Sequence, residues 1–524
     1  MFTKQIFNTI KQKITPAKIF LFISFFLVIF VRLRLLSMPL DRDEGGWAYE
    51  GWLILNGEPP FKYFYDTKMP LIYYIYVLIM VIFGQTIEGI RIGILFTVLI
   101  NMLLVFKTVK KISMDKDRGF LASAFYGLLS LDSGTLSLSG YSTHFVLTFF
   151  MLSLIFILDA LKHGKIFLYF ISGIFAGASF LVKQTSIYFV LFLLAYFISI
   201  NIINRKKIDE IFFNSIFYIS GILLIFGIVL IIMELYGVFD RFWFMAVTYA
   251  LKYGNAVHIR EIKNYIYLFL TLTSVFFISV FILFCIYFLL FIFFAKDLHK
   301  KLLYIFLVLS AFAFSISGFY FYPHYFIVFS LPISILLAED FSDKHRQIQI
   351  SNRVSNLVYL FLIVLLIFFQ FDILFKLSPQ QVSRRLFYIN PFPESMTIAN
   401  FIKNNTGEDS KIAILGSEPQ ILFYSKRKSA TGYVYFNQLM LQNELSHKMQ
   451  TEAIQEIEQS NPEYLIYVNI ITSWGSRLIS SSRIMQWFKD KIDKKEFELI
   501  GLVNIISPNE TEYIWDRKIV KDYK

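Results

Sequence analysis

Acidic and basic side chains gather in one polar stretch near the start of this 524-residue chain, between residues 40 and 71. Asp43 and Glu44 follow one apolar run, and Asp66 and Lys68 precede the next. A carboxylate placed there can take a proton from an acceptor hydroxyl or amine, as a general base does. A neighbouring acid can hold a divalent cation, and a lysine can neutralise a phosphate leaving group. The stretch is the candidate active site; its metal ligands, if any, are unassigned.

The composition indicates a membrane protein. Hydrophobic residues make up 56% of the chain, against roughly 45–50% in average proteins on a count that includes glycine. The formal net charge is +12, but the basic residues form short clusters between apolar runs, which is typical of orientation signals and not of a nucleic-acid-binding face. The single Cys285 lies inside an apolar run, so no intramolecular disulfide can form.

Apolar stretches near the roughly 20 residues needed to cross a bilayer recur along the chain. They predict about eleven transmembrane helices, the first an uncleaved span, at 19–37, 88–106, 119–136, 142–160, 166–182, 186–203, 211–233, 265–294, 302–318, 322–338 and 355–376. The run Pro70–Phe83 is too short and predicts a helix lying at the membrane interface.

Charge supports this assignment. If Pro70–Phe83 does not cross, the basic loops all fall on the side of the N-terminus, which the positive-inside rule makes cytoplasmic. These loops contain Lys107 to Arg118, Lys162 and Lys165, Arg205 to Lys207, Lys296 to Lys301, and Lys344 to Arg353. The first outer loop (38–90), the loop 234–264 and the chain after about residue 378 then face outward. The loop 234–264 suits either a lid over the site or an aromatic belt at the interface.

Two domains are expected: a transmembrane domain over 1–377 and an extracytoplasmic domain over 378–524. In the first outer loop, Asp43 can cap a helix that stops at Asn56-Gly57. The second domain reads as a small α/β domain, with strands at 411–415, 464–468, 497–503 and 512–516 and helices near 391–404, 437–459 and 482–491.

The motifs of the first outer loop resemble those of the GT-C glycosyltransferases. They comprise Asp43-Glu44, an aromatic-rich helix, Asn-Gly-Glu-Pro-Pro, Asp66-x-Lys68-x-Pro70-Leu71-x-Tyr73-Tyr74, Phe83-Gly84 and Arg91. Three later stretches agree: Gly177 to Thr185 with Lys183, Tyr322-Pro323-His324-Tyr325, and Gly416-Ser-Glu418-Pro419-Gln420. The sequence is most similar in these motifs to the bacterial branch related to protein O-mannosyltransferases and aminoarabinose transferases, the family 39-like branch.

The resemblance implies an inverting membrane enzyme of the cell envelope that moves a hexose or pentose from a polyprenyl-phosphate donor to an acceptor outside the cytoplasmic membrane. It implies that Asp43 is the catalytic base, assisted by Glu44. The residues it implies for substrate binding are Lys68, Asp66, Tyr73, Arg91, Lys183, His324 and Tyr325. The sugar and the acceptor, whether lipid, polysaccharide or protein, are not indicated.

Two departures and two alternatives stand beside this reading. His144 takes the place of an acid that many relatives carry in a later outward loop, with Asp132 upstream, and Thr67 replaces the glutamate that precedes the lysine in aminoarabinose transferases. Both leave a metal site and that donor open. The alternatives are a transporter or flippase of a lipid-linked substrate and a non-catalytic GT-C-like subunit. His324 and Lys68 also suit plain interfacial positions.

Overall fold

The computed structural model describes residues 15–255, 257, 259–343, 348–350, 352–441, 444–475 and 482–515. The lysines of the N-terminal segment up to residue 13, Lys344, Arg346 and Asp516, which the sequence predictions used, lie outside these ranges. The chain divides into two compact units. The first contains residues up to 34, 91–231 and 257–376, and the second contains 35–90, 232–256 and 377–524. The first outer loop thus belongs to the same unit as the C-terminal segment.

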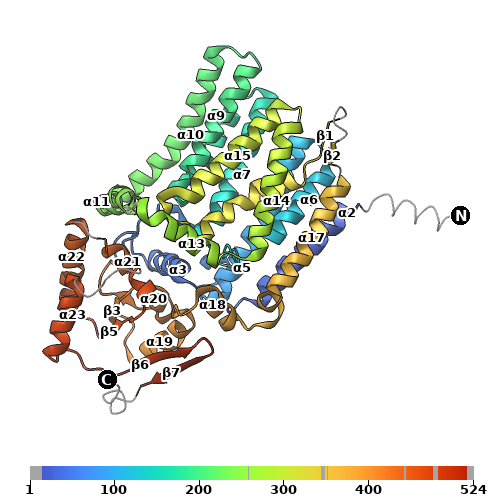
Figure 1. Ribbon diagram of the computed structural model, residues 1–524. Coiled ribbons are helices and arrows are strands. Elements are labelled where there is room, and N and C mark those ends of the chain that lie inside the picture. Colours follow the sequence, from blue (N-terminus) through green and yellow to red (C-terminus); the bar gives the residue numbers. More distant parts are fainter. Residues whose placement is uncertain are drawn as a thin grey trace. The chain divides into compact units, whose positions relative to one another are not determined.

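The first unit is a bundle of apolar helices. Its helices are α2 (Pro16–Arg34), α5 (Ile87–Ser113), α6 (Lys116–Leu129), α7 (Ser142–His163), α8 (Ile166–Val182), η1 (Gln184–Ser186), α9 (Ile187–Ile203), α10 (Ile208–Leu235), η3 (Ile259–Glu261), α13 (Ile262–Leu272), α14 (Val275–Phe294), α15 (Leu298–Ile316), η4 (Ser317–Phe319), η5 (Pro323–Phe329), α16 (Ser330–Leu337), α17 (Asn352–Phe371) and η6 (Asp372–Lys376). A short hairpin, β1 (Phe341–Asp343) and β2 (Ile348–Ile350), precedes α17. Within this bundle α2, α6 and α17 lie side by side (Figure 1).

Eight helices in the described part are long and apolar enough to cross a membrane, and each coincides with one of the predicted spans. Of the remaining three predictions, 166–182 and 322–338 fall on shorter apolar helices. The prediction for 119–136 is too long, because α6 ends at Leu129 and the chain then turns over Asp132. The single predicted helix 265–294 is broken at Thr273, and Ser274 caps α14 by accepting a hydrogen bond from the Phe277 N–H at 3.0 Å.

The second unit contains α3 (Arg42–Leu55) and α4 (Leu71–Phe83) of the first outer loop. From the loop after α10 come α11 (Phe239–Trp243), η2 (Phe244–Tyr249) and α12 (Ala250–Gly254). The C-terminal segment adds α18 (Pro379–Phe387), α19 (Phe392–Asn405), β3 (Lys411–Leu415), α20 (Gln420–Ser425), β4 (Lys428–Ser429), α21 (Phe436–Leu439), α22 (Glu444–Ser460), β5 (Tyr464–Tyr467), η7 (Ile471–Trp474), α23 (Arg483–Asp493), β6 (Leu502–Ser507) and β7 (Glu510–Ile514).

The C-terminal segment has the predicted α/β character. Its sheet is parallel in the order β4-β3-β5, with Ile412 opposite Tyr464, and α22 and α23 lie side by side in this unit (Figure 1). Strands β6 and β7 form a separate antiparallel hairpin. The predicted strand 497–503 is shifted, because the turn after Ser507 fixes the pairing and places β6 at Leu502–Ser507.

The two helices of the first outer loop form as the sequence predicts. Helix α3 ends at Asn56, and Gly57 follows with φ +84°, a conformation that favours glycine. Helix α4 has 13 residues and stops at Gly84, so it is shorter than a transmembrane span.

Candidate active site

The N-terminus of α3 is capped by Asp41 and not, as the sequence analysis expected, by Asp43. The Asp41 carboxylate accepts a hydrogen bond from the Glu44 N–H at 2.9 Å, and the Glu44 carboxylate accepts one from the Asp41 N–H at 3.2 Å. This reciprocal pair is a capping box, which satisfies two backbone donors that a helix start leaves unpaired. The spacing Asp-x-x-Glu was the signal for it. Glu44 is fully buried in this role.

Asp43 differs from both of these neighbours. Its side chain is half-buried and forms no hydrogen bond or ion pair with any residue that the structure describes. Its charge acts on Asp66, on Arg42 and on the Tyr435 hydroxyl. A partly exposed carboxylate without a fixed partner is the kind of group that can accept a proton from an incoming molecule.

Asp66 is buried and fully engaged. Its Oδ1 accepts hydrogen bonds from the Thr67 N–H at 2.6 Å and from Gln438 Nε2 at 3.4 Å, and its Oδ2 accepts one from the Tyr73 hydroxyl at 3.3 Å. Burial raises the pKa of Asp66, Lys68 opposes that rise, and Asp43 adds to it. Tyr73 is itself fully buried, so its hydroxyl orients Asp66. Half-buried Lys68 forms no hydrogen bond or ion pair within the described residues.

Residues of the C-terminal segment complete this site, which sequence reasoning missed. The Ser429 N–H donates a hydrogen bond to the Tyr49 hydroxyl at 2.8 Å, and the Tyr435 hydroxyl donates one to the Arg42 carbonyl at 3.3 Å. Together with the Gln438–Asp66 contact, these hydrogen bonds connect β4 and the region of α21 to α3 and to the segment that precedes α4. They join residues nearly 400 positions apart, and no local pattern in the sequence signals them.

The Gly-Ser-Glu-Pro-Gln motif anchors the start of α3. Arg42 forms an ion pair with Glu418 at 2.7 Å, and Glu418 is fully buried. One turn into the helix, Gly45 packs so closely that a Cβ built there would lie 2.4 Å from the Gln420 Cβ. The motif that carried the sequence resemblance thus fixes the orientation of the helix that presents Asp43.

A second buried acid lies on α3. Glu50 is fully buried, its Oε1 accepts a hydrogen bond from the Phe61 N–H at 3.1 Å, and its Oε2 has no hydrogen-bond partner in the described part of the chain. Burial raises the pKa of Glu50 well above its ordinary value, the Phe61 N–H opposes this, and the charge of Asp66 adds to it. Burial therefore favours the protonated form of Glu50.

Three other predicted residues meet in the first unit. Lys183, at the end of α8, is buried with its Nζ 3.6 Å from the centre of the Tyr325 ring and 5.0 Å from that of Phe314. The His324 ring stacks on Tyr141 at 4.0 Å and meets Tyr325 edge-on at 4.8 Å. The arrangement is a buried cation held against aromatic faces by cation–π contacts.

The remaining candidates have structural surroundings. Arg91 is buried where α5 enters the first unit. Asp132 is fully buried and accepts hydrogen bonds from Ser274 Oγ at 2.6 Å and Gln370 Nε2 at 2.7 Å, so it organises the turn after α6. His144 Nε2 lies 3.1 Å from the Ser137 carbonyl. Among the described residues, no group of three or more His, Cys, Asp or Glu side chains could hold a metal ion.

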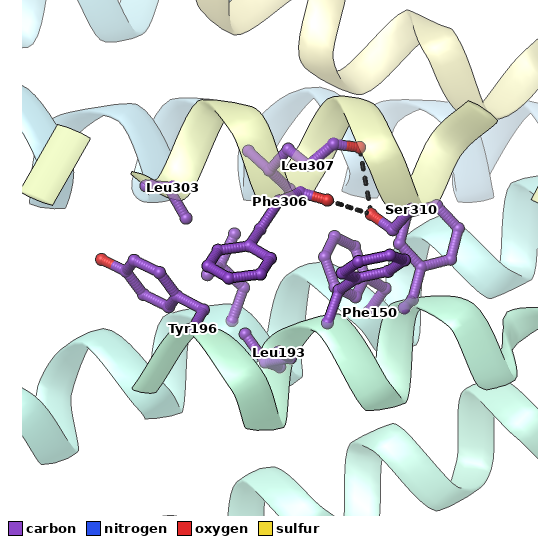
Figure 2. Close-up of a pocket in the computed structure, with 10 residues that line it drawn as sticks. Phe150, Leu193, Tyr196, Leu303, Phe306, Leu307 and Ser310 are labelled. Atoms are coloured by element: carbon purple, nitrogen blue, oxygen red, sulfur yellow. Dashed lines mark hydrogen bonds between the residues drawn. The ribbon is translucent and has the colours of Figure 1, made fainter. Parts of the chain in front are cut away.

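An apolar pocket opens between α7, α9 and α15 of the first unit (Figure 2). Its lining residues are Phe150, Leu154, Phe189, Phe192, Leu193, Tyr196, Leu303, Phe306, Leu307 and Ser310. The Ser310 hydroxyl donates to the Phe306 and Leu307 carbonyls at 2.8 and 3.0 Å, so it offers the pocket no free proton. Phe189 packs on Phe314, whose ring faces Lys183.

Residues 67–233 match the family model of the dolichyl-phosphate-mannose-protein mannosyltransferases. No curated protein sequence matches the chain. Among solved structures, ArnT from Cupriavidus metallidurans bound to undecaprenyl phosphate is similar with a TM-score of 0.51, 13% identity, and coverage of 86% of this chain and 89% of that one. The archaeal oligosaccharyltransferase AglB from Archaeoglobus fulgidus, in complex with an inhibitory peptide and a dolichol-phosphate, is similar with a TM-score of 0.48 and 11% identity. That match covers 95% of this chain and 74% of AglB.

The fold of this chain is that of the GT-C class, and the resemblance drawn from the sequence motifs is confirmed at that level. The eight long apolar helices and this fold make it a multi-pass membrane protein.

Proposed function

We propose that the protein is a membrane glycosyltransferase that moves a sugar from a polyprenyl-phosphate donor to an acceptor on the outer side of the cytoplasmic membrane. The observation that carries this proposal is Asp43, a half-buried carboxylate without a fixed partner on the anchored start of α3. Its charge and that of Lys68 both act on Asp66. The family-model match over residues 67–233 and the GT-C fold agree with it.

Asp43 serves as the general base in this proposal. It takes the proton of the acceptor hydroxyl or amine as that group attacks the anomeric carbon from the face opposite the phosphate, which inverts the centre. The glycosidic carbon–oxygen bond to phosphate breaks, and polyprenyl phosphate leaves with the bonding electrons. Glu44 assists by capping the helix that presents Asp43. Asp66 and Tyr73 hold the loop that presents Lys68, and Lys68 stabilises charge on the leaving phosphate.

The donor lipid is assigned to the cationic and aromatic cluster of the first unit. The buried Lys183 suits a phosphate, and the faces of His324 and Tyr325 suit the first part of the chain beyond it. The pocket between α7, α9 and α15 offers no free hydroxyl at Ser310, so we assign no sugar contact to it (Figure 2). Arg91 is kept as a further candidate for donor binding. A divalent cation has no assigned ligands.

The orientation follows from the basic loops. Short loops rich in Lys and Arg are expected in the cytoplasm, which places the first outer loop and the C-terminal segment outside. The acceptor reaches the second unit from water. Its identity, and that of the sugar, are to be found by experiment.

The test is mass spectrometry of envelope glycans from a deletion strain that carries the wild-type gene, the Asp43→Asn variant or no copy. Deletion is expected to remove one surface sugar, which the wild type alone restores. An unchanged glycan profile in the deletion strain would rule the proposal out. Lipid movement in proteoliposomes without any sugar transfer would instead favour a transporter.

A further inference from the structure

Helix α22 presents two carboxylates one turn apart toward the loops that precede it in the sequence. Glu452 and Glu456 are four residues apart and thus lie on one face of the helix. Glu452 forms an ion pair with Arg241, which comes from α11, and accepts a hydrogen bond from the Tyr433 hydroxyl at 2.7 Å. Arg241 also donates to the Tyr433 hydroxyl at 3.1 Å.

Glu456 engages the first outer loop and the chain beside it. Its Oε1 accepts a hydrogen bond from the Tyr65 hydroxyl at 3.0 Å. Its Oε2 accepts hydrogen bonds from the Thr431 hydroxyl at 2.6 Å and from the Gly432 N–H at 3.0 Å. Both carboxylate oxygens of Glu456 thus accept hydrogen bonds. Of its three partners, Tyr65 belongs to the first outer loop.

Tyr65 joins the two halves of the cluster. Its ring lies beneath the Arg241 guanidinium at 4.2 Å and packs edge-on against Tyr433 at 4.9 Å. Its backbone N–H donates to the Gly432 carbonyl at 2.7 Å. A Cβ built at Gly432 would lie 2.3 Å from the Tyr65 ring, so only glycine allows this approach. Tyr65 directly precedes Asp66 in the chain.

The charges of Arg241 and Glu452 stabilise the contacts of the cluster. Burial alone would raise the pKa of Glu452, but hydrogen bonds and charge from Arg241 and Tyr433 outweigh it, and the pKa lies below the ordinary value. Burial lowers the pKa of Arg241, and Glu452 more than reverses that. The pair is therefore ionised over the whole physiological range, and its hydrogen bonds are of the stronger, charge-assisted kind.

We propose that Tyr65 is a positioning residue, held by Glu456 and by Arg241–Glu452, that sets the place of the Asp66–Lys68 segment for sugar transfer. The inference rests on the proposed function. In this arrangement the C-terminal helix α22 and the loop after α10 act on the reaction through Tyr65 and do not touch the substrate. The C-terminal segment then contributes to the rate of sugar transfer.

The first test compares Tyr65→Phe with wild type in detergent-purified protein, using polyprenyl-phosphate sugars as donors. The variant removes one hydroxyl and leaves the ring on Arg241, and Glu456 keeps its bonds to Thr431 and Gly432. We expect kcat to fall about 10- to 100-fold, because a small misplacement of reacting groups is costly, with KM and Tm nearly unchanged. Tyr63→Phe, in the same loop but without a hydrogen bond to α22, is the matched control and should retain wild-type kcat.

The second test exchanges the charges of the ion pair. Arg241→Glu and Glu452→Arg should each lower kcat. The double variant should have a kcat at least tenfold higher than that of either single variant. Wild-type kcat in Tyr65→Phe, or no recovery in the double variant, would overturn the inference.

A third measurement does not depend on activity. Hydrogen–deuterium exchange of the peptide covering 61–70 should be faster in Tyr65→Phe than in wild type or Tyr63→Phe. Equal exchange would overturn the inference even if the proposed function holds. Full activity of Asp43→Asn would instead overturn the proposed function and leave the exchange result standing.

Discussion

The two units place charged residues in opposite kinds of surroundings. In the second unit, carboxylates are held by backbone N–H groups, hydroxyls and an amide, and one of them, Asp43, is left without a hydrogen bond among the described residues. In the first unit, Lys183 is enclosed by the rings of Tyr325 and Phe314. The first arrangement suits proton transfer to a polar molecule, and the second suits an anion attached to an apolar chain. The comparison supports our proposal that the second unit supplies the base and that the first unit binds the donor lipid.

A smaller comparison within the second unit sharpens this assignment. Asp41, Glu44 and Asp66 are carboxyl groups of the same loop as Asp43, yet each serves a hydrogen-bond network that shapes the loop. A committed carboxylate is a poor base, because accepting a proton would break its bonds. That criterion separates Asp43 from the other three carboxyl groups, and Asp43 is also the residue that the sequence resemblance implied as the base.

The largest effect is expected for Asp43→Asn. The variant keeps size and polarity but removes the base, so kcat should fall by about 10²- to 10⁴-fold, the range that general bases contribute. Transfer from polyprenyl-phosphate sugars by purified protein is the measurement. Glu44→Gln retains an acceptor oxygen for the helix cap, so its kcat should fall much less. Equal losses of kcat in the two variants would contradict the distinction between the two acids.

Next in size is the effect of Lys183→Met on binding of polyprenyl phosphate. Loss of one charge-assisted contact, about 1.5–3 kcal/mol, should weaken binding by about 10- to 100-fold. Labelled polyprenyl phosphate and purified protein in lipid nanodiscs provide the assay. Lys206→Met, which alters an exposed lysine of the same unit, is the control. Unaltered binding in Lys183→Met would remove the first unit's cluster from donor recognition.

Gly45→Ala tests the close contact between α3 and the Gly-Ser-Glu-Pro-Gln motif. Alanine in place of a helical glycine ordinarily stabilises by about 1 kcal/mol, but here the added methyl would meet Gln420 at 2.4 Å. We expect a net loss of about 1–3 kcal/mol, seen as a lower Tm. Gly227→Ala, with no atom within 4 Å of the built Cβ, should not lower Tm. A stabilised Gly45→Ala would contradict the described packing.

The smallest effect concerns pH and Glu50. Because burial raises its pKa above the ordinary 4.5, the folded protein retains a proton that the unfolded chain has released as pH rises above that value. Wild-type stability should therefore decline with rising pH relative to Glu50→Gln, which cannot titrate. The Tm difference between the two proteins, measured from pH 4.5 to 8, should widen in favour of the variant. A constant difference would contradict a raised pKa of Glu50 in the folded protein.

Local signals in the sequence predicted much of this fold. Long apolar runs identified the helices, and Asn56-Gly57 identified the end of α3. The cap was misassigned because Asp43 was considered alone, whereas the Asp41-x-x-Glu44 spacing allows a reciprocal pair. Asp43 and Lys68 were also predicted from sequence as site residues, and we propose them as such. The hydrogen bonds from the C-terminal segment to this loop were not predicted. The bonds between Ser429 and Tyr49 and between Gln438 and Asp66 depend on tertiary packing.

The central claim is that the two clusters do different parts of one reaction. It is tested most directly by measuring kcat and polyprenyl phosphate affinity for Asp43→Asn and Lys183→Met in parallel. The account predicts that Asp43→Asn loses kcat and keeps its affinity for polyprenyl phosphate, whereas Lys183→Met loses that affinity first. The account would be contradicted if Asp43→Asn had a lower affinity for polyprenyl phosphate and a wild-type kcat at saturating donor.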